Sequence, residues 1–118
     1  ILENCQHVSK FLFERLEQLK DSSKIVSDIR GRGLLVGIEF MKDKSKNILF
    51  DPDEQVSNRI NNIAMDLGAI FYPGSGGIDG LHGEHLIISP PLNVTLKEID
   101  EILGILSRAI FKLEQSIY

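Results

Sequence analysis

A glycine-rich stretch holds the first residues whose types and spacing could do chemistry. Residues 73–77 read PGSGG, and glycines at this density allow backbone amides to converge on an anion such as a phosphate. The stretch lacks the lysine and the directly following helix that a phosphate-binding P-loop requires. We therefore interpret it as a loop, and we do not expect it to bind a nucleotide.

Four side chains of metal-binding type follow closely: Asp79, His82, Glu84 and His85. Carboxylates and imidazoles are common ligands of zinc and other divalent metals. However, the two histidines lie on a loop that leads into a predicted strand, and no cysteine accompanies them. The pattern therefore favours no built metal site.

Two other groups of residues have structural explanations. Arg30 and Arg32 alternate with glycines and could contact RNA, but single arginines beside strand-forming residues favour a structural role at a bulge or an ion pair. Cys5 and His7 cannot act as nucleophile and base, because residues two apart on a helix point in different directions. We expect Cys5 to be a thiol of the core.

Three helices are expected to position these residues. Apolar residues at spacings of three and four predict a first helix over residues 1–19. The second helix should run over residues 51–67, because Asp51 is a typical N-cap, Pro52 fits the first helical position and a glutamate follows to complete a capping box. A second capping box predicts a long amphipathic helix over residues 95–117.

Four short strands complete the pattern. They are expected over residues 25–29, 34–41, 69–72 and 85–89, with a turn or bulge at residues 30–33 and the second strand in the centre of a sheet. The order of helix, strand, strand, helix, strand, strand, helix predicts an α/β domain of the two-layer α+β type. In such a domain, about three helices cover one small sheet of three to four strands.

Composition limits the classes of partner. A chain of 118 residues predicts one domain, and the balance of 13 basic and 17 acidic residues gives a net charge of −4, which disfavours nucleic acid. No apolar run approaches the length of a membrane span, and nothing marks a signal peptide. Because Cys5 has no internal partner, we expect a reducing compartment, the cytoplasm. The chain opens at Ile1, and we expect it to be a piece of a longer polypeptide.

Three motifs in order resemble one known family. They are residues 26–39 (VSDIRGRGLLVGIE), residues 83–92 (GEHLIISPPL) and residues 95–100 (TLKEID). Together they resemble the C-terminal small domain of class III aminotransferases, the pyridoxal-phosphate enzymes that include ω-amino acid, ornithine and 4-aminobutyrate transaminases. The resemblance covers nearly the whole chain and implies a mostly antiparallel sheet, as in the small domain of fold type I pyridoxal-phosphate enzymes.

The resemblance also implies an activity. The longer enzyme would move an amino group from an amine or ω-amino acid to a keto acid or aldehyde, and it would be a homodimer. Its large domain would precede Ile1, carry the lysine that forms the Schiff base with pyridoxal phosphate, and bind most of that cofactor. Residues 1–118 would be the substrate-side small domain, inactive when alone.

The resemblance implies a substrate contact as well. Many members of the family place an arginine about ten residues before the Pro-Pro pair, where it holds a substrate carboxylate. That position is Gly80 here. We therefore predict that Gly80, Leu81 and His82 line the substrate entrance. Two alternatives stay open: a free-standing regulatory module that binds a small molecule, and a structural or oligomerisation domain.

Overall fold

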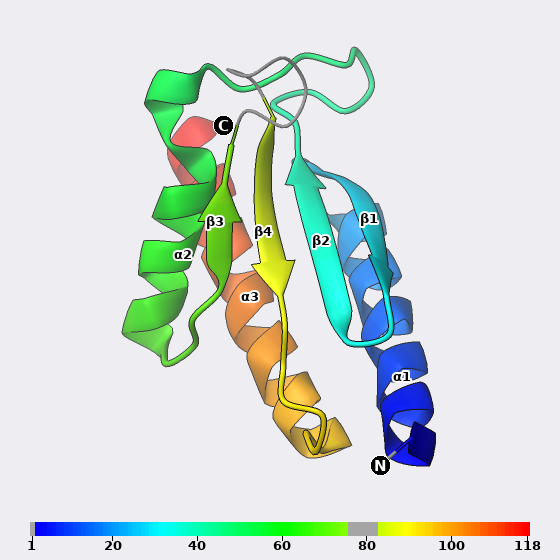
Figure 1. Ribbon diagram of the computed structural model, residues 1–118. Helices are drawn as coiled ribbons and strands as arrows, with labels where there is room; N and C mark the ends of the chain where they lie inside the picture. The colour runs from blue at the N-terminus through cyan, green and yellow to red at the C-terminus, as the bar shows by residue number, and fades with distance from the viewer. Residues whose placement is uncertain (1, 76–82) are drawn as a thin grey trace.

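The computed structural model describes residues 2–75 and 83–118, which fold around one sheet (Figure 1). The elements follow the predicted order, with one additional 3-10 turn, η1. Their bounds are α1 Leu2–Ser22, β1 Val26–Arg32, β2 Leu35–Phe40, η1 Pro52–Glu54, α2 Val56–Leu67, β3 Tyr72–Gly74, β4 Glu84–Ile88 and α3 Leu96–Ile117.

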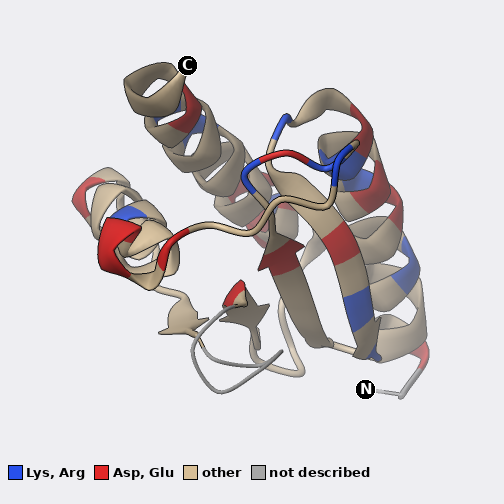
Figure 2. Ribbon diagram, turned by 90° about the horizontal axis from the view of Figure 1, so that it is seen from above, with Lys and Arg blue, Asp and Glu red and all other residues tan. Residues whose placement is uncertain are grey.

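The four strands form one antiparallel sheet in the order β1-β2-β4-β3. The three α-helices lie on one side of this sheet, behind it in Figure 1 and above it in Figure 2. This two-layer arrangement confirms the predicted fold class, and β2 is central as expected. Residues that alternate along the strands, such as Val36, Ile38 and Leu86, are fully buried against the helices.

The β1–β2 hairpin confirms the predicted turn. Arg32 pairs with Leu35, so the loop between the strands has only two residues, and the first of them is Gly33 with φ of 62°. A glycine in this position allows the backbone twist that two-residue hairpin loops prefer. The register of the pair shifts between Val26 and Asp28, at the other end of β1.

The predicted helix over residues 51–67 is wrong at its start. Asp51 does form a capping box, but the box caps the short η1 turn. Gln55 then adopts a left-handed conformation with φ of 52°, and α2 begins only at Val56. A residue in this conformation interrupts the hydrogen-bond ladder of an α-helix, so the one predicted helix is a turn followed by a helix.

The third strand also lies later than expected. Ala69 and Phe71 are buried, and the amide of Phe71 donates to the side-chain oxygen of Asn61 on α2 at 2.8 Å. That amide is therefore not part of the sheet, and pairing begins at Tyr72. Pro73 is tolerated because β3 is an edge strand.

The C-terminal helix confirms its prediction. Thr95 and Glu98 form the capping box, and the helix runs to Ile117. Its apolar stripe lies in the core, together with residues of α1, α2 and the sheet; the buried members include Ile99, Leu103, Leu106, Ile110 and Leu113. Cys5, expected in the core, is half-buried at its edge. None of the described helices combines the length and the apolar character needed to cross a membrane.

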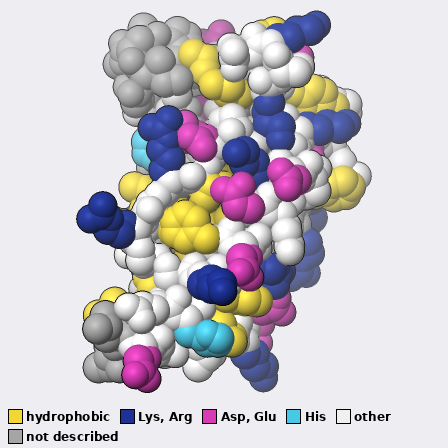
Figure 3. Space-filling view, turned by 90° about the vertical axis from the view of Figure 1, so that its right-hand side faces the viewer, with side chains coloured by type: hydrophobic (Ala, Val, Ile, Leu, Met, Phe, Trp, Pro, Cys, Tyr) yellow, Lys and Arg dark blue, Asp and Glu magenta, His cyan; other side chains and the backbone are white. Residues whose placement is uncertain are grey.

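The side of the molecule that carries α1 and β1 has charges of both signs (Figure 3). Lysine and arginine side chains alternate there with aspartates and glutamates, and Arg15 of α1 is paired with Asp100 of α3. The described part of this face therefore has no concentrated cationic surface. The exclusion of nucleic acid stays a prediction.

Candidate functional site

The face of the sheet that the helices leave open carries the candidate site. Residues on this face are half-buried, and they alternate along each strand with the buried ones. The strand register brings Glu39 of β2 beside His85 of β4, and His85 in turn pairs with Gly74 of β3. A second row next to it contains Gly37 and Ile87.

His85 occupies the space that the missing side chain of Gly74 leaves. A β-carbon at Gly74 would lie 2.3 Å from Nε2 of His85, which is far inside van der Waals contact. The imidazole therefore lies directly against the backbone of β3. On the other side of His85, a pocket of about 70 Å³ lies between the ends of β2 and β4; its lining includes Ser27, Glu39, Met41, Gly83 and His85.

The helix side of the same strand holds a buried carboxylate. Glu84 is 5% exposed, and its Oε1 accepts hydrogen bonds from the backbone amide of Ser57 at 2.9 Å and from the Ser57 hydroxyl at 3.2 Å. Ser57 is the second residue of α2, where amides have no partner within the helix. A negative charge at this end also interacts favourably with the helix dipole.

An ion pair occupies the edge of the open face. Nε of Arg30 lies 2.7 Å from Oδ2 of Asp28 and 3.8 Å from Oε1 of Glu39. The hydrogen bond from Arg30, helped by the amide of Ile29, lowers the pKa of Asp28 against the opposing effect of burial. The same bond raises the pKa of Arg30. The ion pair expected for Arg30 is confirmed, so this guanidinium is already engaged.

The predicted substrate residues Gly80, Leu81 and His82 lie outside the described residues, as does Asp79. The other two residues of the group with metal-binding side chains are described, and they separate. Glu84 faces the helices, whereas His85 lies on the open face. Among residues 2–75 and 83–118, no three metal-binding side chains come together.

The lysines test whether this chain could hold pyridoxal phosphate. A lysine that forms a Schiff base needs burial or a cationic neighbour to lower the pKa of its amine. All eight lysines are described, and none is buried. Lys20 and Lys44 are half-buried, and Nζ of Lys44 donates to the carbonyls of Lys20 and Ser23 at 2.7 and 2.6 Å. The described lysines therefore do not fit the cofactor linkage.

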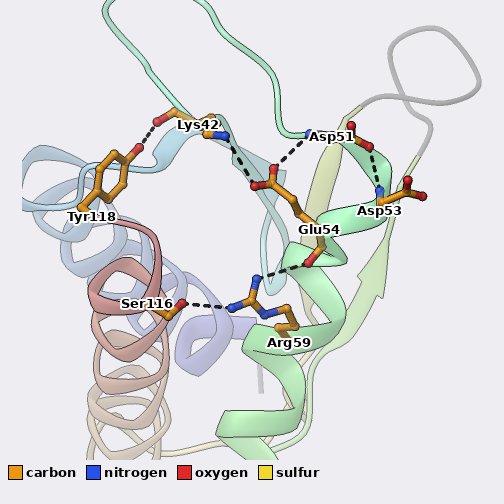
Figure 4. A network of polar contacts seen from close by, with 7 residues as sticks. All are labelled: Lys42, Asp51, Asp53, Glu54, Arg59, Ser116 and Tyr118. Carbon is orange, nitrogen blue, oxygen red and sulfur yellow. Dashed lines mark hydrogen bonds and ion pairs between the residues drawn. The ribbon is translucent and has the colours of Figure 1, made fainter.

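A polar network links the start of α2 to the η1 turn, to the end of α3 and to Lys42 (Figure 4). Arg59 of α2 donates to the carbonyl of Glu54 at 3.4 Å and to the hydroxyl of Ser116 on α3 at 2.9 Å. The Glu54 carboxylate lies 3.5 Å from Nζ of Lys42, whose carbonyl accepts from the Tyr118 hydroxyl. Partial burial, together with nearby carboxylates, raises the pKa of Tyr118, so its hydroxyl remains a donor.

Sequence reasoning missed Ser57 and Gly74 as parts of the site. Ser57 lies 27 residues from Glu84 in the chain, and a serine in the first turn of a helix has no specific local signal. The sequence predicts a loop at Gly74, whereas in the structure this residue ends β3. The acidic residue Glu84 is the one local signal of this contact, and its residue type also fits a metal ligand.

Comparison with solved structures defines the class of protein. A transaminase from the marine bacterium Virgibacillus superimposes with a TM-score of 0.90 and 27% sequence identity. The match covers 98% of this chain and 25% of the transaminase chain. The four-stranded sheet and its three helices therefore have the fold of one part of a transaminase.

Comparison of sequences gives the family. The family model described as aminotransferase class-III matches residues 1–110, and the chain belongs to that family. An uncharacterized aminotransferase of Schizosaccharomyces pombe is 39% identical over 110 residues, which is 93% of this chain and 24% of the relative. An alanine/serine racemase of Pyrococcus horikoshii is 33% identical over 93% of this chain and 21% of its own length. The chain thus spans about a quarter of the length of the relatives it matches.

Proposed function

We propose that this chain is the C-terminal, substrate-side small domain of a longer pyridoxal-phosphate-dependent transaminase. That enzyme would transfer an amino group from an amine or ω-amino acid to a keto acid or aldehyde. The observation that carries the proposal is the family match over residues 1–110 by a chain that spans about a quarter of its relatives. The absence of a buried lysine among the eight described ones supports a cofactor linkage elsewhere in the longer polypeptide.

Exposed apolar residues support a larger assembly. Ile70, Tyr72 and Leu92 are 73%, 60% and 62% exposed, and they lie at the same end of β3 and β4. A pocket of about 370 Å³ lies beside them, lined by the start of β3 and by Pro90 and Pro91. Burial of such side chains against further parts of the polypeptide would be favourable, at roughly 25 cal/mol for each Å² of apolar surface.

We assign substrate contact to Gly80, Leu81 and His82. These residues connect β3 to β4, and the described ends of that connection lie at Gly74 and Glu84 beside the open face of the sheet. Gly80 has no side chain with which to hold a substrate carboxylate at this position. The proposal therefore places recognition in His82, in the backbone of the connection or in the large domain.

The decisive experiment uses the native polypeptide of several hundred residues. It should contain a lysine linked to pyridoxal phosphate and should transfer an amino group from amines to a keto acid. Gly80→Arg and His82→Ala should each change kcat/KM for at least one donor. A native product of 118 residues, or unchanged kcat/KM for every substrate in both variants, would contradict the assignment.

Two controls separate related outcomes. The 118-residue chain alone should give no stoichiometric adduct with pyridoxal phosphate that borohydride traps at one lysine. Because one relative is named a racemase, chiral analysis of the amino acid products should be run beside the transfer assay. Inversion of configuration without transfer to the acceptor would replace transamination with racemisation. Size measurements on the longer polypeptide would test the proposed homodimer, and its localisation would test the proposed cytoplasmic site.

A further inference from the structure

We propose that Ser57 is a positioning residue that fixes both ends of the connection between β3 and β4. The inference rests on the proposed function, because this connection carries the residues assigned to the substrate. Ser57 lies on α2 and would act on the substrate only through the connection. The geometry behind the proposal involves described residues alone.

Ser57 contacts the chain on both sides of the connection. Its hydroxyl lies 3.1 Å from the carbonyl oxygen of Gly74, the last residue of β3. The same hydroxyl lies 3.2 Å from Oε1 of Glu84, the first residue of β4, and the Ser57 amide donates to that oxygen at 2.9 Å. Because a hydroxyl has one hydrogen, it donates to one of these oxygens at a time, while the amide holds Glu84 throughout.

This contact lies where the sheet stops holding the two strands. The last pair of the β3–β4 ladder is Gly74 with His85, so the strands have no further described ladder pair toward residues 75–83. Ser57 is 1% exposed, and water therefore does not compete for its hydrogen bonds. The separation of the two ends sets the conformations that a connecting segment can adopt. A small change in the position of a binding group has large effects on the affinity for its ligand or on the rate.

The helix that carries Ser57 is fixed by other contacts. Arg59 holds the start of α2 to Glu54 and Ser116, as Figure 4 shows, and Gly68 ends the helix. We therefore expect removal of the Ser57 hydroxyl to leave the backbone of α2 in place. The expected effect is confined to the ends of the connection, which distinguishes a positioning role from support of the whole fold.

The test compares Ser57→Ala with Ser9→Ala. Ser9 on α1 is a matched control, because its hydroxyl also donates to a glycine carbonyl, that of Gly33, at 2.7 Å on another part of the molecule. In the longer polypeptide, Ser57→Ala should raise KM for the amine about tenfold and change kcat less than twofold, the pattern of lost ground-state binding. Ser9→Ala should leave both constants unchanged.

A second measurement does not depend on the proposed activity. In the 118-residue chain, amide hydrogen exchange at the described ends of the connection, residues 74–75 and 83–84, should be about tenfold faster in Ser57→Ala than in Ser9→Ala, with equal exchange in α2. If Ser57→Ala does not fold, Ser57→Cys provides the second variant with the same expected direction, because a thiol has nearly the size of the hydroxyl and is a weak donor. Unchanged exchange and unchanged KM would overturn the inference. Faster exchange in a longer polypeptide without transaminase activity would leave Ser57 as the anchor and refute the proposed function.

Discussion

Replacement of Glu114 by alanine should be one of the most destabilising single changes in this chain. Glu114 is 9% exposed on α3, and its Oε1 accepts hydrogen bonds from the Ser23 hydroxyl at 2.6 Å and the Lys24 amide at 2.9 Å. The Ser23 hydroxyl oxygen accepts in turn from the amides of Ile25 and Val26. One carboxylate therefore organises the turn that leads from α1 into β1.

The magnitude follows from these contacts. A hydrogen bond to a charged group contributes about 1.5–3 kcal/mol, so two of them contribute about 3–6 kcal/mol. The alanine variant has no carboxylate to desolvate on folding, and the removal of this unfavourable free energy offsets part of the loss. We expect Glu114→Ala to lower the free energy of unfolding by about 3 kcal/mol. Glu114→Gln keeps one acceptor oxygen and should lower it by about 1 kcal/mol.

Urea unfolding followed by far-ultraviolet circular dichroism measures these differences. Glu101→Ala is the matched control, because Glu101 is an exposed glutamate on the same helix, and it should change the free energy of unfolding by less than about 0.5 kcal/mol. A loss below about 1 kcal/mol for Glu114→Ala, or a loss equal to that of Glu101→Ala, would refute the reasoning, since it would mean that the two hydrogen bonds contribute nothing net.

Three further changes test other parts of the structure. Gly74→Ala should cost about 1 kcal/mol through its clash with the ring of His85, and this cost should vanish in a His85→Ala background, as a double-mutant cycle would show. Since Arg30 lowers the pKa of Asp28 in the folded state, the stability from this pair is present above the unfolded pKa and is lost as pH falls through the folded pKa. Asp28→Asn should therefore flatten the decline in stability as pH falls below the ordinary pKa of an aspartate. The effect should be small because the pair is exposed, and acid titrations of both proteins would measure it. Lys44→Met removes two hydrogen bonds to carbonyls at the end of α1 and should lower the free energy of unfolding by about 1–2 kcal/mol. Urea unfolding would show this loss as a lower midpoint concentration.

The order of the elements was predictable because each has a strong local signal. Periodic apolar residues, the capping box at Thr95 and the glycine of the β1–β2 turn all act through neighbours in the chain. The errors arise where a distant or unusual interaction decides. Gln55 adopts a left-handed conformation, which is uncommon for glutamine and has no signal in the sequence. This residue separates the η1 turn from α2. The side-chain oxygen of Asn61 accepts a hydrogen bond from the amide of Phe71, so β3 begins only at Tyr72.

The candidate site was predictable only in part for the same reason. The resemblance predicts substrate residues in the connection between β3 and β4, and that assignment stays a prediction. The contacts at the ends of the connection come from α2, which lies earlier in the chain. A carboxylate at position 84 could bind a metal ion or accept hydrogen bonds from the first amides of a helix, and only the fold distinguishes these two roles. The strand alternation directs Glu84 toward Ser57 and His85 toward the open face.

Charged side chains therefore have different roles on the two sides of the sheet. On the helix side, the buried carboxylates of Glu84 and Glu114 accept from backbone amides of neighbouring segments, so their charge contributes to the fold. On the open face, Asp28, Arg30 and Glu39 pair with one another near the edge, and their exposure makes the pairing weak. Substitution of a helix-side carboxylate should thus change stability strongly. Substitution on the open face should change stability little. A large change in substrate preference from such a variant would be evidence that this face contributes to recognition in the proposed longer enzyme.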